Sequence, residues 1–496
     1  MTAPTKYKDQ ASSRPKSSPT DHEIGWWAAL TTYCGYAVLI LFGHIRDTYD
    51  WVVGSSRNTE KGYSPLVKDH EDFYTRRMYM RIRDCFNRPI CSAPGSHINV
   101  LERVSNDGNV TEKLTGRYRT CLNLGSYNYL GFGDAESPCR ESVLQALDKF
   151  SVSTCSSRME AGTTALHQEL ETLVAKFIGK PAAMIVGMGF ATNSTVIPAL
   201  VGKSDLIISD SCNHSSIVVG ARLSRATVKV FRHQDVADLE HQIRHAIVYG
   251  QPKTHRPWRK ILVIVEGIYS MEGEICKLAE IVQVVKKYKC YLFVDEAHSI
   301  GALGATGRGI CEYTGVDPAS VDILMGTFTK SFGGVGGYIA GSPELIMHLR
   351  NSCAGSVYSP SISPVICQQI ISAMKVIAGL DGTIDGRKRL ESLRRNANFF
   401  RDAMVEMGCH VLGDHDSPVV PVILCNPAKI AAFSRECLKR NLAVVVVGFP
   451  ATPVVLSRVR FCISAGHTIP DLENAVEQLK EICDLVHIKY RSKITG

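Results

Sequence analysis

The sequence predicts a large α/β domain built on a mainly parallel sheet, preceded by an apolar N-terminal segment and followed by a smaller α+β domain. Three observations carry this prediction. From about Cys121 to Gly355, short apolar runs alternate with helical patterns, as in strands joined by helices. Polar residues gather where several apolar runs end. After Pro364, long helical patterns replace the alternation and only a few strand-like runs remain.

Composition is that of an ordinary globular protein. The chain has 496 residues, of which 45% are hydrophobic and 21% charged, so it is long enough for a large core. A formal net charge of +8 is mild for this length and indicates no nucleic-acid partner. The seventeen cysteines are scattered and form no C-x-x-C pair, so the sequence predicts neither a metal site nor a disulfide framework.

The N-terminal region divides into three parts. Residues 1–20 are rich in Lys, Ser and Pro, and we expect a disordered tail. Residues 21–50 include the uncharged run "IGWWAALTTYCGYAVLILFG", which is just long enough for a helix that crosses a bilayer. We expect this helix to span or lie on a membrane, and a buried hydrophobic helix is the alternative. We expect residues 51–115 to form an N-terminal arm that leads into the large domain.

Periodicity indicates the elements of the large domain, residues 116–365. The largely apolar runs "AAMIV", "DLIIS", "VKVF", "ILVIV", "YLFV" and "VDILM" predict strands. The segment "KLAEIVQVVKKYK" predicts a helix between two of them. A second helix is predicted to end at Gly179, with an apolar face formed by Leu166, Leu170, Val174 and Phe177. Residues 366–496, with the helical segment "RKRLESLRRNANFFRDAMVEM" and the strand-like "AVVVVGF", form the predicted C-terminal small domain.

Chemically active side chains follow the predicted strands. The strand in "YLFVDEAHS" is followed by Asp295, Glu296 and His298, and "ILVIVEGIYS" ends in Glu266 and Ser270. A third strand, in "VDILMGTFTK", leads to Thr327 and Lys330, and "AAMIVGMGF" ends in a glycine turn before a helical pattern. The carboxyl ends of parallel strands meet at one edge of a sheet, so we expect these side chains to converge there.

A nucleotide-binding interpretation of these motifs is weak. "VDEAH" matches the acidic box of a helicase, and "TKS" resembles part of a phosphate-binding loop. Such a loop requires G-x-x-x-x-G-K-[ST], with Gly directly before the lysine. Here Thr329 precedes Lys330, and the "TKS" lies after the acidic box instead of before it.

Pyridoxal phosphate (PLP) fits the same residues better. This cofactor needs a lysine for a Schiff base, an acid beside its pyridine nitrogen and donors for its phosphate. Lys330 and Asp295 offer the first two, and "GMGF" before a helix offers backbone N–H groups for the third. The ring of His214 could stack on the cofactor. Each residue alone has an ordinary interpretation, as a surface lysine, a helix cap or a loop histidine. Their combination in one α/β chain is far more specific.

The motifs also resemble a known family. "GTFTKSFG", "VDEAHSIGALGATGRG", "VEGIYSMEGE", "GMGFATNS", "NHSS" and "SRVRFCISAGHT" are similar to those of the α-oxoamine synthases. The resemblance runs from about Tyr118 to the C-terminus. It implies PLP-dependent transferase fold type I, which is aspartate aminotransferase-like, and condensation of an amino acid with an acyl-CoA with loss of CO2. Within the family, "VVVVGFPATP" and "SPVVPVIL" most resemble the catalytic, second long-chain-base subunits of eukaryotic serine palmitoyltransferases.

The resemblance implies a role for each matched position. Lys330 would bind the cofactor and exchange protons at the substrate, Asp295 would pair with the pyridine nitrogen, and His214 would stack on the ring. His298 and Ser270 would lie near the phenolic oxygen. The remaining positions would hold the phosphate (Gly189, Phe190 and Thr327) and the amino acid's carboxylate (Arg460). Three small-for-small departures, at Ser215, at Gly466 and in "GGVGG", remove no catalytic group.

The resemblance further implies substrates and partners. L-serine and palmitoyl-CoA would give 3-ketodihydrosphingosine, CoA and CO2, the first step of sphingolipid biosynthesis. The implied assembly is a heterodimer with a homologous subunit that lacks the lysine, together with small membrane regulatory subunits. "VYSPSIS" (residues 357–363) resembles the segment that reaches the neighbouring active site. The implied location is the endoplasmic reticulum membrane, with the catalytic domain facing the cytosol.

Three other functions stay open at the level of sequence. The first is another α-oxoamine synthase, of the aminolevulinate, aminooxononanoate or aminoacetone type. The hydrophobic N-terminus argues against it. The second is a scaffolding subunit without activity, which has no need of both Lys330 and Asp295. The third is an NTP-driven helicase, for which we expect no ATP hydrolysis.

Overall fold

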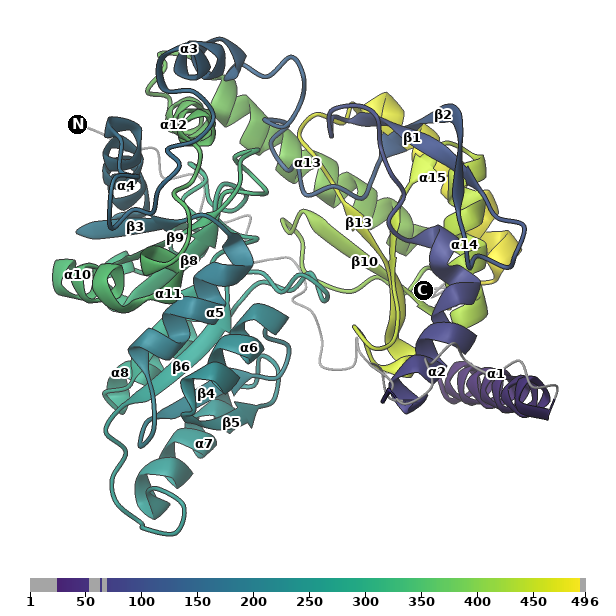
Figure 1. Cartoon of the computed structure of the whole chain (residues 1–496), viewed down its shortest axis with the longest axis horizontal. Helices are drawn as coiled ribbons and strands as arrows, with labels where there is room; N and C mark the ends of the chain where they lie inside the picture. The colour runs from purple at the N-terminus through teal and green to yellow at the C-terminus, as the bar shows by residue number, and fades with distance from the viewer. Residues whose placement is uncertain (1–24, 53–62, 65–68, 491–496) are drawn as a thin grey trace.

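The computed structural model describes residues 25–52, 63–64 and 69–490 (Figure 1). The expected disordered tail, residues 1–20, lies outside the described residues. Two groups of elements are visible, one around a large sheet and one around the C-terminal strands. The helix α1 lies beside α2 at the edge of the second group. The predicted fold class, an aminotransferase-like α/β fold with a mostly parallel sheet, is confirmed.

The large sheet has seven strands. Their order across the sheet is β3 (Ala182–Val186), β9 (Gly337–Gly341), β8 (Ile323–Thr327), β7 (Tyr291–Asp295), β6 (Ile261–Glu266), β4 (Leu206–Asp210) and β5 (Thr227–Phe231). Strands β4 to β8 run parallel to one another, and β9 is antiparallel to both of its neighbours. The six predicted strands are all present. Strand β9 was not predicted, because "GYIAG" has a glycine at each end and only three residues between them to form an apolar run.

Helices cover both faces of this sheet. Successive residues of a strand point to opposite faces, so Val263 packs in one core cluster and Ile264 in the other. The first face is covered by α3 (Arg140–Phe150), α4 (Ala165–Ile178), α7 (Val236–Tyr249), α8 (Leu278–Lys287) and α12 (Pro364–Ile377). The second is covered by α5 (Gly189–Leu200), α6 (Ser215–Ser224) and α10 (Pro343–Ser352). The two helices predicted in the large domain, α4 and α8, are confirmed, and Gly179 ends α4 in a left-handed conformation with φ of 80°.

The C-terminal group has its own core. It contains β10 (Val419–Cys425), β12 (Val445–Val447) and β13 (Ser457–Cys462), with α13 (Asp385–Glu406), α14 (Pro427–Lys439) and α15 (Ile469–Val486). A second small sheet joins β1 (His97–Val104) and β2 (Lys113–Asn123) to β11 (Leu442–Ala443). The short helices are α2 (Asp69–Arg77), α9 (Ile310–Thr314) and α11 (Ala354–Val357). A 3₁₀ helix covers Tyr79–Cys85, and single 3₁₀ turns cover Pro318–Ser320 and Val454–Leu456.

The borders of the two groups differ from the expected boundaries at two places. Strand β2, expected at the start of the large domain, pairs with β11, and Leu122 and Leu124 belong to the C-terminal core. Helix α12, expected in the small domain, packs Ile370 and Ile371 against the large sheet. In both cases the element belongs to the group whose core buries its apolar side chains. The order of residues along the chain does not reveal this.

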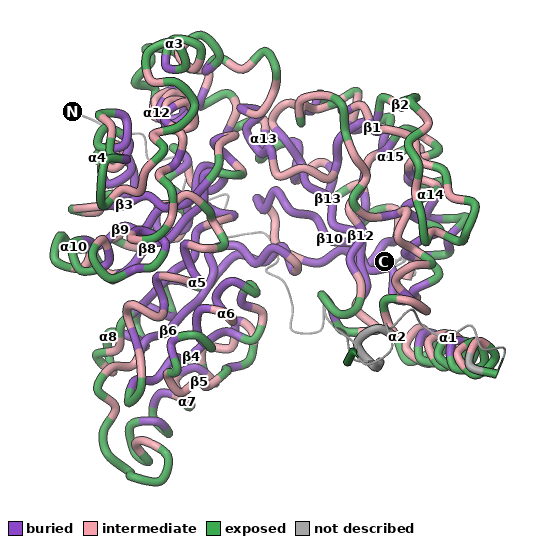
Figure 2. The backbone as a smooth tube through the Cα atoms, in the orientation of Figure 1, coloured by how far each residue is buried: buried purple, intermediate pink, exposed green. Residues whose placement is uncertain are grey.

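Helix α1 (Trp26–Val52) carries the predicted membrane segment. Residues 26–50 are long and apolar enough to cross a membrane, by length and composition only, and little of this stretch is buried (Figure 2). One end packs on α2, where Asp47 pairs with Arg76 at 2.8 Å and with Arg77 at 2.6 Å. Large apolar side chains are exposed along α1, among them Leu41 and Phe42. The described helix is consistent with membrane anchoring.

Candidate active site

A cavity of about 470 Å³ opens at the carboxyl ends of the parallel strands. Nine residues with predicted site roles line it together: Gly189, Phe190, His214, Ser270, Asp295, His298, Thr327, Lys330 and Arg460. They lie after β6, at or after the ends of β7 and β8, at the starts of α5 and α6, and on β13 of the C-terminal group. The cavity also contacts residues that the sequence analysis did not single out: Tyr127, Met188, Asn193, Ser216, Met271, Ala297, Met325 and Thr329.

Lys330 follows β8 and is half-buried. Its Nζ lies 5.3 Å from the ring centroid of Tyr127. Burial lowers the pKa of Lys330 to about 8, although Asp295 and Glu266 favour the charged form. An amine with this pKa can lose its proton near neutral pH much more easily than an ordinary lysine. It is therefore suited to act as a base or a nucleophile.

Asp295 and Glu266 are the two carboxyl side chains that line the cavity. Asp295 is buried at the end of β7, where Oδ1 accepts a hydrogen bond from the Ala297 N–H at 2.8 Å. Asp295 pairs with Glu266 on the adjacent strand β6. The Glu266 side chain accepts a hydrogen bond from the backbone N–H of His214. Burial, together with the nearby Asp295, raises the pKa of Glu266 well above its ordinary value. Burial therefore disfavours the charged form of the Glu266 carboxyl.

Asn193 links Asp295 to His214. Its Nδ2 donates to Asp295 Oδ2 at 2.7 Å and to Ser216 Oγ at 3.0 Å, and that hydroxyl lies 2.7 Å from Nδ1 of His214. The side chain of Asn193 thereby fixes the orientation of two predicted site residues. The sequence could have indicated this position of Asn193. It is four residues after Gly189 and therefore lies on the same face of α5.

His298 and Arg460 both line the cavity and both lie near the ring of Tyr127. The hydroxyl of Tyr129 lies 2.8 Å from Nδ1 of His298. Burial and the nearby Lys330 cation lower the pKa of His298 well below its ordinary value, so this imidazole is neutral. The Arg460 guanidinium lies 4.7 Å from the Tyr127 ring centroid, and its buried Nε has no hydrogen-bond partner among the described residues. A buried cation with an unused donor is suited to bind a carboxylate.

The groups that line the cavity match the chemical groups of PLP. Helix α5 begins at Gly189 without a side-chain cap on its first N–H groups, which leaves them for an anion. A Cβ built on Gly189 would come within 2.7 Å of Thr327 Oγ1, so a glycine is required for this close approach. A lysine with a lowered pKa and a buried aspartate face the same space. A phosphate, a carbonyl and a basic ring nitrogen thus each find a matching group.

Gly189→Ala is expected to raise the dissociation constant for PLP about tenfold or more, because the added methyl group displaces Thr327 at the helix start. Absorbance of the loaded protein during dialysis measures the loss. Gly202→Ala, at the other end of α5, serves as the control, since its Cβ meets nothing closer than 3.8 Å. Equal cofactor retention in both variants would contradict this account of the helix start.

Comparison with known proteins agrees with this geometry. The family model "Aminotransferase class I and II" matches residues 119–479. "Long chain base biosynthesis protein 2a" of Oryza sativa subsp. japonica is 59% identical over 94% of this chain and 96% of its own length. "Serine palmitoyltransferase 2" of Dictyostelium discoideum is 51% identical over the same shares.

A solved structure supports the cofactor assignment. The structure described as "High resolution structure of SPT with PLP internal aldimine" is 28% identical, has a TM-score of 0.70, and covers 81% of this chain and 93% of its own. The chain belongs to the aminotransferase class I and II family and, within it, to the PLP-dependent enzymes that include long chain base biosynthesis protein 2 and serine palmitoyltransferase.

Proposed function

We propose that this chain is the catalytic subunit of a serine C-palmitoyltransferase. It joins L-serine to palmitoyl-CoA with loss of CO2 and CoA, and the product is 3-ketodihydrosphingosine. The observation that carries the proposal is one cavity holding Lys330, Asp295 and Arg460, in a chain 51–59% identical to relatives with these names. The other predicted site residues line the same space.

The cofactor would be held by the residues that surround the cavity. Asp295 would pair with the pyridine nitrogen, and His214, which is exposed at the open side, would stack on the ring. Thr327 and the start of α5, at Gly189 and Phe190, would hold the phosphate. Ser270 and His298 would lie near the phenolic oxygen. When bound, PLP supplies a carbonyl that bonds to amines and a ring that accepts electrons.

The remaining steps belong to the chain's own groups. Arg460 binds the carboxylate of the amino acid, for which its guanidinium has an unused donor. Lys330 Nζ removes the Cα proton of the bound amino acid, and the pKa of about 8 lets it do so near neutral pH. Asn193 keeps Asp295 and Ser216 in place while these groups act. The buried walls limit the access of water to the reacting carbon.

The proposal includes a partner and a membrane location. The partner is a homologous subunit without the lysine, in a heterodimer joined by small membrane regulatory subunits. The location is the endoplasmic reticulum membrane, with the catalytic part in the cytosol. Helix α1 supports anchoring in a membrane. The seventeen cysteines are all free thiols, which suits a reducing compartment.

Membrane binding through α1 can be tested on its exposed face. Leu41 and Phe42 are 59% and 55% exposed, so a double substitution by lysine leaves the packing of the protein intact. Each lysine costs about 3 kcal/mol in an inserted helix, so the variant should leave membranes in flotation assays. Val248→Lys on α7, where the side chain is 75% exposed, should float like the unchanged protein. Membrane retention of the double variant would refute anchoring by α1.

Product analysis tests the reaction itself. Mass spectrometry of incubations with L-serine and palmitoyl-CoA, with and without the partner subunit, should show 3-ketodihydrosphingosine. Glycine and alanine with shorter acyl-CoA compounds are the competitors in the same assay. A preference for glycine with a short acyl-CoA would assign the chain to another branch of the α-oxoamine synthases. ATP hydrolysis without formation of 3-ketodihydrosphingosine would refute the proposal.

A further inference from the structure

The segment after β6 forms a short hairpin, residues 268–275, which we name the site hairpin. Ile268 and Ile275 form its bridge, and the Tyr269 N–H donates to the Glu274 carbonyl at 3.0 Å. Its tip, Ser270 and Met271, lines the active-site cavity. The hairpin contacts both parts of the site: the N–H of Gly267, just before it, donates to the Asp295 carbonyl of β7, and Arg458 of β13 donates to its tip.

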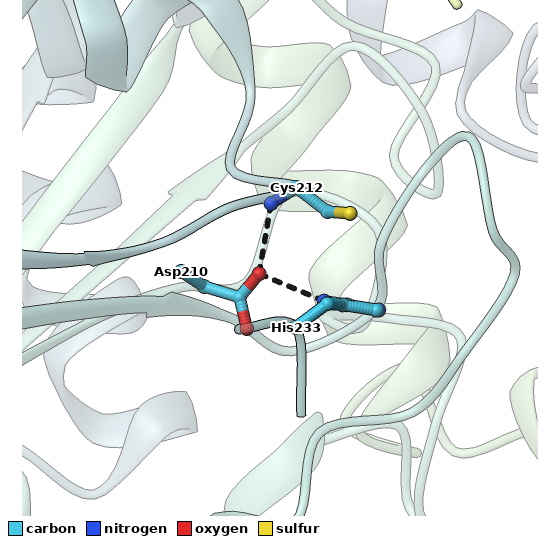
Figure 3. A group of neighbouring side chains, drawn as sticks. All are labelled: Asp210, Cys212 and His233. Atoms are coloured by element: carbon cyan, nitrogen blue, oxygen red, sulfur yellow. Dashed lines mark hydrogen bonds and ion pairs between the residues drawn. The ribbon is translucent and has the colours of Figure 1, made fainter. Parts of the chain in front are cut away.

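One charged contact holds the hairpin to the large sheet. His233 lies 2.7 Å from Asp210 through Nδ1 and 3.3 Å from Glu274 through Nε2 (Figure 3 shows the Asp210 side). Burial opposes a charge here, but the hydrogen bonds to Asp210, Cys212 and Glu274 outweigh it and hold the pKa of His233 well above its ordinary value. The imidazolium therefore ties the far strand of the hairpin to the end of β4.

Three side chains around His233 are of the kinds that bind metal ions: a carboxylate, a thiol and an imidazole. The side chains of Asp210, Cys212 and His233 come close enough to share an ion. However, Asp210 already accepts hydrogen bonds from the N–H of Cys212 at 2.8 Å, from His233 at 2.7 Å and from the N–H of Gln234 at 3.1 Å. Both carboxylate oxygens are used, so the arrangement is a hydrogen-bonded support for the hairpin.

A second charged contact holds the tip to the C-terminal strands. Arg458 on β13 is 1% exposed and donates from Nη1 to the Met271 carbonyl at 2.7 Å and to Glu272 Oε1 at 3.4 Å. Arg460 is two residues further along β13, so both guanidinium groups leave the same face of the strand. Nη1 of Arg460 lies 3.8 Å from Sδ of Met271. Met271 is thus fixed through its carbonyl and touches Arg460 through its side chain.

We propose that Arg458 and Met271 are positioning residues that place the Arg460 guanidinium for binding the amino-acid carboxylate. This inference rests on the proposed function, in which Arg460 binds that carboxylate. Arg460 makes no ion pair among the described residues; apart from Cys462 on its own strand, its side chain contacts the Tyr127 ring and the Met271 thioether. A shift of the hairpin tip would move one of these two supports. Affinity for the amino acid would fall, while binding of the acyl-CoA would stay the same.

The test compares two variants with a matched control in the loaded heterodimer. Arg458→Lys keeps the charge but cannot make all of the arginine's contacts, and Met271→Leu keeps the volume but removes the sulfur. Arg103→Lys is the control, because Arg103 likewise binds a carboxylate, Glu112, at 2.6 Å, and a backbone carbonyl, that of Phe86, at 2.8 Å, outside the cavity. Titrating L-serine against the visible cofactor band gives its dissociation constant, and steady-state kinetics give KM for the acyl-CoA.

The expected results separate a positioning role from a loss of stability. Arg458→Lys should raise the dissociation constant for serine about tenfold and Met271→Leu about threefold, with KM for the acyl-CoA within about twofold in both. Arg103→Lys should bind serine normally. If Arg458→Lys does not fold, Met271→Leu alone decides. Unchanged serine binding in the folded variants overturns the inference. If no amino acid alters the band of the unchanged protein, the proposed function has failed instead.

Discussion

Replacing Lys330 by alanine should reduce turnover by at least about 10³-fold, since a positioned proton-transfer group contributes about 10²–10⁴-fold and here also binds the cofactor. The variant should lose the visible absorbance of the loaded protein. Burial is the physical basis, because it lowers the pKa of Lys330 to about 8 and so gives a reactive amine near neutral pH. The absorbance spectrum and product formation from L-serine and palmitoyl-CoA measure the two effects.

Two further variants show whether the amine itself is needed. Lys330→Arg keeps a cation of similar length, but a guanidinium does not lose its proton in a protein, so activity should stay lost. Lys180→Ala removes another lysine whose pKa burial lowers, and Lys180 lies outside the cavity. Its variant should keep the visible band and its turnover. A pure, folded complex with Lys330→Ala that still shows the band would exclude Lys330 as the cofactor lysine.

The sequence predicted the elements whose pattern is local. Strands β3 to β8 are runs of apolar residues, and α4 has an apolar stripe and a terminal glycine, so each could be recognised without its neighbours. The antiparallel strand β9 has no such pattern, because only three apolar residues lie between its two terminal glycines. Likewise, β2 joins the C-terminal core through its pairing with β11, which is more than three hundred positions away.

The same distinction applies to the site. Lys330, Asp295 and His214 follow predicted strands, and the parallel arrangement alone brings their elements to one edge. Tyr127 and Met271 lack such a signal, since each matters through its contact with Arg460 on a strand that comes much later in the chain. Their importance depends on how the C-terminal strands pack over the cavity.

Asp295→Asn should reduce turnover about 10³-fold, the loss typical when a preorganised charge is removed from a buried site. Asparagine has nearly the same shape, so the change isolates the negative charge that would keep the pyridine nitrogen protonated. Glu266 is a poor replacement, because burial, the largest cause of its raised pKa, remains in the variant. Steady-state turnover, with cofactor content measured separately, is the appropriate assay.

The control for Asp295→Asn must also remove a buried carboxylate charge. Asp205→Asn does so outside the cavity, where Asp205 is fully buried and pairs with Arg259 at 2.7 Å. Both variants should lose stability, but only Asp295→Asn should lose turnover at full cofactor content. Asn193→Ala separates charge from orientation, because it keeps the carboxylate and removes the 2.7 Å hydrogen bond that orients it. Its loss should be smaller, about tenfold. Equal turnover in Asp295→Asn and Asp205→Asn would mean that the carboxylate has no part in the chemistry.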